Sequence, residues 1–183
     1  MTARSKSLIA VLGALLSGCA GVPAGLQEIR TVPHVDIERY MGTWYPILNI
    51  PPSIEKDAYN SMEQYSLDDD GNIPTRFTYH KGSANGELKT LDSKAYIVDR
   101  QSNAQWGVKF FWFQPVKSEY LIAWLADDYS EVIVARNKRD YVWYMARTPN
   151  VSAEQIAAAI RKIEALGYDL SKLNRVRADG GGP

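Results

Sequence analysis

The residue types that carry most enzymatic chemistry are scarce in this chain of 183 residues, and they lie far apart. Its only histidines are His34 and His80, and its only cysteine is Cys19. No serine lies in a Gly-x-Ser-x-Gly elbow, and no histidine and cysteine spacing suits zinc. Asp68–Gly71 superficially resembles a calcium loop, but the remaining ligands are absent and a hairpin turn is the better interpretation. We therefore predict no catalytic site, no metal site and no cofactor.

Glu63 is an acidic residue within a predicted strand, on a face that is otherwise largely apolar. Strand alternation places it on the same face as Tyr59 and Tyr65. A carboxylate on an apolar face costs free energy unless it is paired or protonated. Two interpretations stay open: Glu63 lies near the head group of a ligand, or it faces an open rim or is turned outward by a bulge.

The N-terminus has the order of a secretory signal. Two positive charges within Met1–Lys6 precede the apolar stretch Leu8–Leu16, which is too short to span a bilayer. The following Leu-Ser-Gly-Cys resembles a bacterial lipobox, which implies that Cys19 is lipidated and becomes the first mature residue. The alternative is a plain secretory signal with an incidental cysteine. By resemblance to bacterial lipoproteins, Ala20 after the cysteine favours the outer membrane, with the protein facing the periplasm.

Charge and composition exclude several partners and classes. Lysine plus arginine equals aspartate plus glutamate, and removal of the signal leaves a slight negative excess. The chain thus lacks the basic footprint of a nucleic-acid-binding protein and a polybasic run for anionic lipid. Its hydrophobic content of 45% argues against disorder. We expect a signal over 1–18, a tether over 19–32, one domain over 33–177 and a tail over 178–183.

After a short helical turn near Asp36–Met41, the domain reads as short β-rich runs separated by turn residues, a spacing typical of an antiparallel barrel or sandwich. One helix follows. Ser152 and Gln155 form a capping box, and apolar residues at helical spacing give it one buried face, so it must pack outside the sheet. The eight runs are Trp44–Ile50, Tyr59–Leu67, Ile73–His80, Leu88–Val98, Trp106–Phe113, Tyr120–Ala126, Glu131–Arg136 and Tyr141–Arg147.

Three short motifs occur in an order that resembles the lipocalins. Gly42-Thr43-Trp44 is similar to the Gly-x-Trp signature of the first strand. Asp127-Asp128-Tyr129 is similar to a later Thr-Asp-Tyr turn, with Asp127 where threonine is usual, and Arg147 is similar to the arginine that ends the last strand. The resemblance covers about 33–176. With the lipobox it is closest to the bacterial outer-membrane lipocalins, which are similar to apolipoprotein D. It implies an eight-stranded antiparallel up-and-down barrel with one C-terminal helix outside.

We expect Trp44 and Arg147 to close one end of this barrel, because a guanidinium can lie flat on an indole. Gly42 would permit close backbone approach there. The alternative is that Trp44 is ordinary core and Arg147 is exposed. Counting by two from this pair sets the inward faces, although Phe77 and Thr78 compete in the third run. The expected ligand-lining residues are Leu48, Tyr59, Glu63, Tyr65, Val108, Phe110, Trp112, Tyr120, Ile122, Trp124 and Trp143.

The lipocalin resemblance implies a non-enzymatic protein that binds and stores or transports a small amphiphilic lipid. The expected ligand class is a fatty acid such as palmitate, a lysophospholipid or a similar amphiphile. Two rivals stay open: an enzyme on the same barrel that uses Glu63 with His80 or Tyr65 on a bound lipid, and a structural envelope lipoprotein with a fully packed barrel. The sequence does not decide the oligomeric state, and a homodimer is one alternative.

Overall fold

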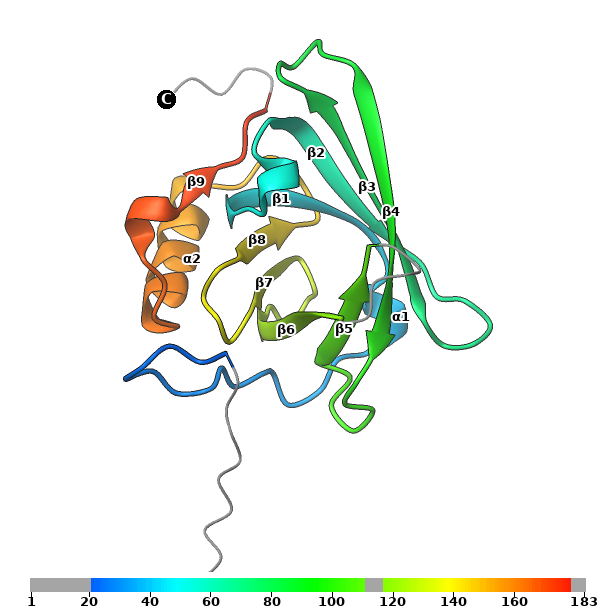
Figure 1. Cartoon of the computed structure of the whole chain (residues 1–183), viewed down its shortest axis with the longest axis vertical. Helices are drawn as coiled ribbons and strands as arrows, with labels where there is room; N and C mark the ends of the chain where they lie inside the picture. The colour runs from blue at the N-terminus through cyan, green and yellow to red at the C-terminus, as the bar shows by residue number, and fades with distance from the viewer. Residues whose placement is uncertain (1–20, 111–116, 179–183) are drawn as a thin grey trace, which may run out of the picture.

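Alternating apolar residues and frequent turns produce a closed antiparallel barrel (Figure 1). The computed structural model describes residues 21–110 and 117–178. A short helix, α1 (Ile37–Tyr40), leads into the first strand. The barrel strands are β1 (Gly42–Ile50), β2 (Ala58–Tyr65), β3 (Ile73–Lys81), β4 (Leu88–Ile97), β5 (Gln105–Lys109), β6 (Ser118–Leu125), β7 (Glu131–Ala135) and β8 (Val142–Ala146).

Each barrel strand pairs with the next along the chain, and β1 pairs with both β8 and β2, so the sheet closes on itself. This confirms the predicted eight-stranded up-and-down barrel. The β1–β2 turn contains a 3-10 helix, η1 (Ser53–Glu55). A second one, η2 (Leu170–Lys172), precedes the short strand β9 (Asn174–Arg175), which pairs with β1.

The helix α2 (Ala153–Ala165) lies outside the barrel, as its single apolar face requires (Figure 1). The predicted capping box is present: the Ser152 hydroxyl accepts from the Gln155 amide, and the Gln155 side chain accepts from the Ser152 amide. Ala159 and Ile163 are buried in an outer core between the helix and the sheet. Within 21–110 and 117–178, no helix is long and apolar enough to cross a membrane.

A second core fills one end of the barrel interior. Trp44, Trp106 and Tyr40 are almost wholly buried there, together with inward residues of β6 to β8. This inner core seals the barrel at the end where β1 begins. We call it the closed end.

Three β-bulges interrupt the strict alternation from which the inward faces were predicted. They fall between Pro46 and Leu48, between Tyr59 and Met62, and between Ile122 and Trp124. Each bulge adds a residue on one strand and so reverses the direction of the side chains beyond it. The predicted inward direction is therefore wrong for Leu48, Tyr59 and Trp124.

Their observed positions follow from this reversal. Leu48 is buried in the outer core under α2. Trp124 also packs against the outer core, with the Lys162 ammonium 4.5 Å from its ring centroid. Tyr59 lies beside the C-terminal segment, where the Arg177 guanidinium is 5.1 Å from its ring centroid.

Candidate ligand cavity

The three family-like motifs meet at the closed end. The Arg147 guanidinium carbon lies 3.9 Å from the ring centroid of Trp44, which is fully buried. Arg147 also donates to the carbonyls of Thr43, Tyr40, Arg39 and Tyr129, at 2.9, 3.0, 2.7 and 3.3 Å. It thus ties the start of β1 to the turn before β7, in addition to covering the indole.

Gly42 and Asp127 each have a local explanation at this end. Gly42 has φ +94°, a conformation that other residues rarely adopt, so the backbone favours glycine there. The Arg39 guanidinium donates a hydrogen bond to the backbone carbonyl of Asp127. Because any residue type supplies a carbonyl, the departure from threonine leaves this contact in place.

Above the Trp44 floor, three tyrosine hydroxyls form a buried chain. The Tyr40 and Tyr120 hydroxyls are 2.7 Å apart, and Tyr120 donates to the Tyr65 hydroxyl at 3.1 Å. The Trp106 ring stacks on Tyr120 with a centroid distance of 4.8 Å. Burial raises the pKa of all three tyrosines well above the usual value, so their hydroxyls stay neutral. Tyr40 was not among the predicted site residues, because it comes from the segment before the first strand.

A narrow cavity lies between this floor and the open end. Its volume is about 80 Å³, measured as the space open to the centre of a water molecule. The wall is largely apolar and includes Phe77, Leu91 and Met145, which settles the ambiguous third run in favour of Phe77. Of the predicted ligand-lining residues, the structure brings these together around the cavity: Glu63, Tyr65, Val108, Phe110, Tyr120 and Trp143.

The other predicted ligand-lining residues do not reach this wall in the part of the chain that is described. Leu48, Tyr59 and Trp124 face outward beyond their bulges. Ile122 points inward as predicted, but it is buried in the closed-end core below the cavity. Trp112, like Cys19, the predicted lipidation site, lies outside the described residues.

Among the described residues, three carboxyl groups line the largely apolar cavity, those of Glu55, Glu63 and Glu119, and Glu119 accepts from the Asn137 amide and side chain. Glu63 comes from β2, and Glu55 folds in from η1, with only 8% of its surface exposed. The Trp143 indole donates to Glu55 at 3.0 Å. Burial raises the pKa of Glu55 to about 7. Burial, followed by repulsion from Glu55, raises the pKa of Glu63 to about 8, against a lowering hydrogen bond from Tyr65.

Glu63 therefore faces the cavity, so the interpretation in which a bulge turns it outward is wrong. Glu55 was missed because only the fold of the β1–β2 turn brings it back over the barrel. The pairing of Glu63 with His80 is not formed: His80 is hydrogen-bonded to the Gly86 carbonyl at 2.8 Å and is absent from the cavity wall.

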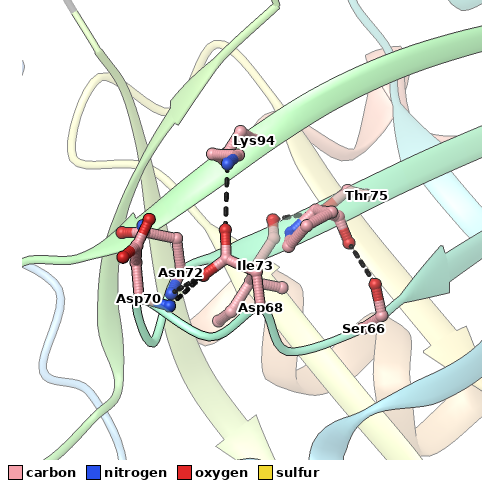
Figure 2. Close-up of polar contacts among 8 residues, drawn as sticks. Ser66, Asp68, Asp70, Asn72, Ile73, Thr75 and Lys94 are labelled. Carbon is pink, nitrogen blue, oxygen red and sulfur yellow. Dashed lines mark hydrogen bonds and ion pairs between the residues drawn. The ribbon is translucent and has the colours of Figure 1, made fainter.

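The aspartate run is a hairpin turn, as predicted (Figure 2). One carboxylate oxygen of Asp68 accepts from the amides of Asp70 and Asn72, at 3.1 and 2.8 Å. The other lies 2.9 Å from the Lys94 ammonium, which lowers the pKa of Asp68. Among the described residues, no group of three or more histidines, cysteines or acids could hold a metal ion.

Comparisons with known proteins agree with this geometry. The lipocalin-like domain family matches residues 35–178. The outer membrane lipoprotein Blc of Escherichia coli K12 is 30% identical over 177 residues, covering 93% of this chain and 95% of that protein. Apolipoprotein D of Macaca fascicularis is 28% identical, covering 91% and 93%. Insecticyanin from the tobacco hornworm shares the fold, with a TM-score of 0.65 and 14% identity over 84% of this chain and 86% of that one.

Proposed function

Because the chain belongs to the lipocalin family, whose members are mostly non-enzymatic binding proteins, we propose that it binds a single-chain lipid in its barrel cavity and stores or transports it. The observation that carries this proposal is the narrow apolar cavity above a sealed aromatic floor. The ligand class is a fatty acid, a lysophospholipid or a similar amphiphile. A single hydrocarbon chain suits a narrow space better than a rigid ring system does.

Burial of the tail would supply most of the affinity. Each methylene removed from water contributes about 0.8 kcal/mol, before the costs of association are subtracted. The cavity wall offers this contact through Phe77, Val108 and Met145. The raised pKa values of Glu55 and Glu63 favour their neutral forms below pH 7, so these two side chains add little charge to the wall beside the tail.

We further propose that the protein is anchored by lipid on Cys19 in a bacterial outer membrane, facing the periplasm. The Leu-Ser-Gly-Cys sequence supports this anchor. The Blc relatives, whose name describes outer membrane lipoproteins, support the compartment. Anchor and barrel would then act separately, one holding the protein at the membrane and the other holding the ligand.

Titration of the purified protein with palmitate and with lysophospholipids tests ligand binding directly. Trp143 lines the cavity, so we expect its fluorescence to change in a saturable way. A native mass spectrum of protein purified from its own membrane should also show a bound lipid and report the oligomeric state. Absence of both the fluorescence change and a bound lipid would contradict the proposal.

A pair of matched variants tests whether the lipid binds inside the barrel cavity. Val108→Phe adds bulk inside the cavity and should weaken binding at least ten-fold, with a stability cost of about 1–3 kcal/mol. Val151→Phe adds the same bulk beside the outer core and should leave affinity unchanged. Equal affinity of the two variants would place the ligand elsewhere.

A further inference from the structure

The barrel wall has a break between β1 and β2, which pair with each other only near the closed end. The two strands pair only over Gly42–Trp44 of β1 and Glu63–Tyr65 of β2. Toward the open end, the C-terminal segment lies between the two strands. Leu48 of β1 pairs with Arg175, and the amide of Asn60 in β2 donates to the Arg177 carbonyl at 2.8 Å. Figure 1 shows this red segment rising from α2 to β1 and β2.

A second hollow of about 650 Å³ opens at this break, and four cations line it. They are Lys56, Lys172, Arg175 and Arg177. We call this hollow the basic groove. The acids on its wall are Asp57 and Glu55, so the cations are in excess even when both acids are ionised.

The basic groove adjoins the barrel cavity. Glu55 and Phe77 line both hollows, and they mark the boundary between them. Of the described residues on the cavity side, the three acids Glu55, Glu63 and Glu119 outnumber the one cation, Arg136, which lies 3.4 Å from Asp140, so this wall disfavours a buried anion. On the groove side, the four cations favour one. The charge distribution therefore sets a direction for an amphiphile, with its tail in the cavity and an anionic head in the groove.

We propose that the basic groove is a head-group subsite for a phosphate-bearing single-chain lipid whose tail occupies the barrel cavity. This inference rests on the lipid-binding function proposed above and specifies its ligand class. A phosphate joined to the tail through glycerol supplies a polar linker across the boundary at Glu55 and Phe77. A fatty-acid carboxylate has no such linker, and reaching the groove would draw its first methylenes out of the cavity.

Arginine suits this role because its guanidinium can hold two phosphate oxygens at once. Arg177 is already oriented, since it donates to the Tyr59 hydroxyl at 3.2 Å. The Arg175 side chain is exposed at the groove. Lys172 lies 3.3 Å from Asp169 in an exposed ion pair that an incoming phosphate can replace.

The test compares two lipids that share one acyl chain and differ in the phosphate: 1-lauroyl lysophosphatidate and 1-lauroylglycerol. The purified protein is compared with the variant Lys172→Gln/Arg175→Gln. We expect this variant to lose at least ten-fold in affinity for the lysophosphatidate and to bind 1-lauroylglycerol within two-fold of the parent. The lysophosphatidate affinity of the parent should also fall with added salt.

A matched control removes two positive charges elsewhere. Arg100→Gln/Arg161→Gln changes exposed residues of the β4–β5 loop and α2 that do not line the groove, and it should leave both affinities unchanged. Arg136→Gln removes a cation of the cavity wall itself. If Arg136→Gln abolishes lysophosphatidate binding and the groove variant does not, the head group lies in the cavity mouth and the inference is wrong.

The remaining outcomes separate this inference from the proposed function. If both lipids bind the groove variant as they bind the parent, the subsite is disproved while lipid binding stands. If neither lipid binds the parent, the proposed function fails and the subsite with it. If inorganic phosphate displaces the lysophosphatidate at an equal concentration, the groove is a free-phosphate site and the role of the tail is disproved. Thermal melts of each variant verify that it is folded.

Discussion

At the scale of single residues, Arg147 does more than was predicted from its position alone. Stacking on Trp44 was expected, but the guanidinium also donates to four backbone carbonyls, three within 39–43 and one in the turn before β7. Charge-assisted hydrogen bonds are stronger than neutral ones, and carbonyls left without a donor in a partly buried place are costly. Arg147 therefore contributes to stability through the backbone as well as through the indole.

This geometry predicts the outcome of a double-mutant cycle. Trp44→Ala should cost about 3–5 kcal/mol of unfolding free energy, as for other buried aromatics. Arg147→Ala should cost about 2–3 kcal/mol, through the stack and the carbonyl bonds together. The two losses should fall short of adding by about 1 kcal/mol, because each variant removes the shared stack. Denaturant melts of both single variants and the double variant measure this coupling, and strict additivity would contradict it.

Glu63 predicts an unusual dependence of stability on pH. The pKa of Glu63 is about 8 in the folded protein, against an ordinary value of 4.5 for the unfolded chain. Between these two pH values the folded state therefore keeps a proton that the unfolded state has released. This contribution is fully present below pH 4.5 and is lost as the pH rises through 8. Glu63→Gln keeps a neutral group there, and it should reduce the fall in unfolding free energy between pH 5 and pH 8 by roughly 2–4 kcal/mol.

The measurement is a set of denaturant melts at several pH values within this range. Glu55 has a pKa of about 7 and should leave a smaller fall of the same sign in the variant. Glu164→Gln, an exposed change on α2, is the control and should follow the parent. An identical pH profile for the parent and Glu63→Gln would show that Glu63 is not held protonated.

At the scale of elements, the capping box connects the helix to the barrel. The Gln155 side chain accepts from the Ser152 amide and also donates to Glu131 of β7 at 2.6 Å. Glu131 in turn accepts from the Tyr144 hydroxyl of β8 at 2.6 Å. These polar contacts position the first turn of α2 on the sheet, in addition to the packing of its apolar face.

Ser152→Ala should destabilise the protein by about 1 kcal/mol, the usual cost of removing an N-cap hydroxyl. The Gln155 amide would lose its acceptor, and the orientation of the Gln155 side chain toward Glu131 would loosen. Chemical denaturation measures the change. Ser83→Ala, at the exposed tip of the β3–β4 hairpin, is the matched control and should have almost no effect. Equal losses for the two variants would rule out a specific capping role.

At the scale of the whole molecule, the proposed anchor and the barrel should be independent. Cys19→Ser removes the proposed lipidation site, so the protein should leave the membrane fraction and become extractable without detergent. Its melting temperature should match that of the parent after detergent correction, because the barrel is closed by contacts within 35–178. Fractionation followed by a salt wash checks this. A variant that stays membrane-bound after the wash would contradict the lipobox interpretation.

Local patterns in the sequence predicted an antiparallel barrel or sandwich with one outer helix, because alternation with period two and a capping box are read from neighbouring residues. The resemblance to the lipocalins implied the closed eight-stranded barrel and pointed to Trp44 and Arg147 as the pair at its closed end. The inward direction of Glu63, Tyr65 and Trp143 followed from the same alternation, because no bulge lies between each of them and the closed end.

The rest of the cavity wall could not be predicted from local patterns. The directions of Leu48, Tyr59 and Trp124 depend on bulges, which exist only in relation to a partner strand and therefore leave no local signature. Glu55 reaches the cavity because the β1–β2 turn folds over the open end. The basic groove likewise joins residues of that turn with residues near the C-terminus, more than a hundred positions later. Contacts between such distant segments are set by barrel closure, and alternation within a single strand carries no information about them.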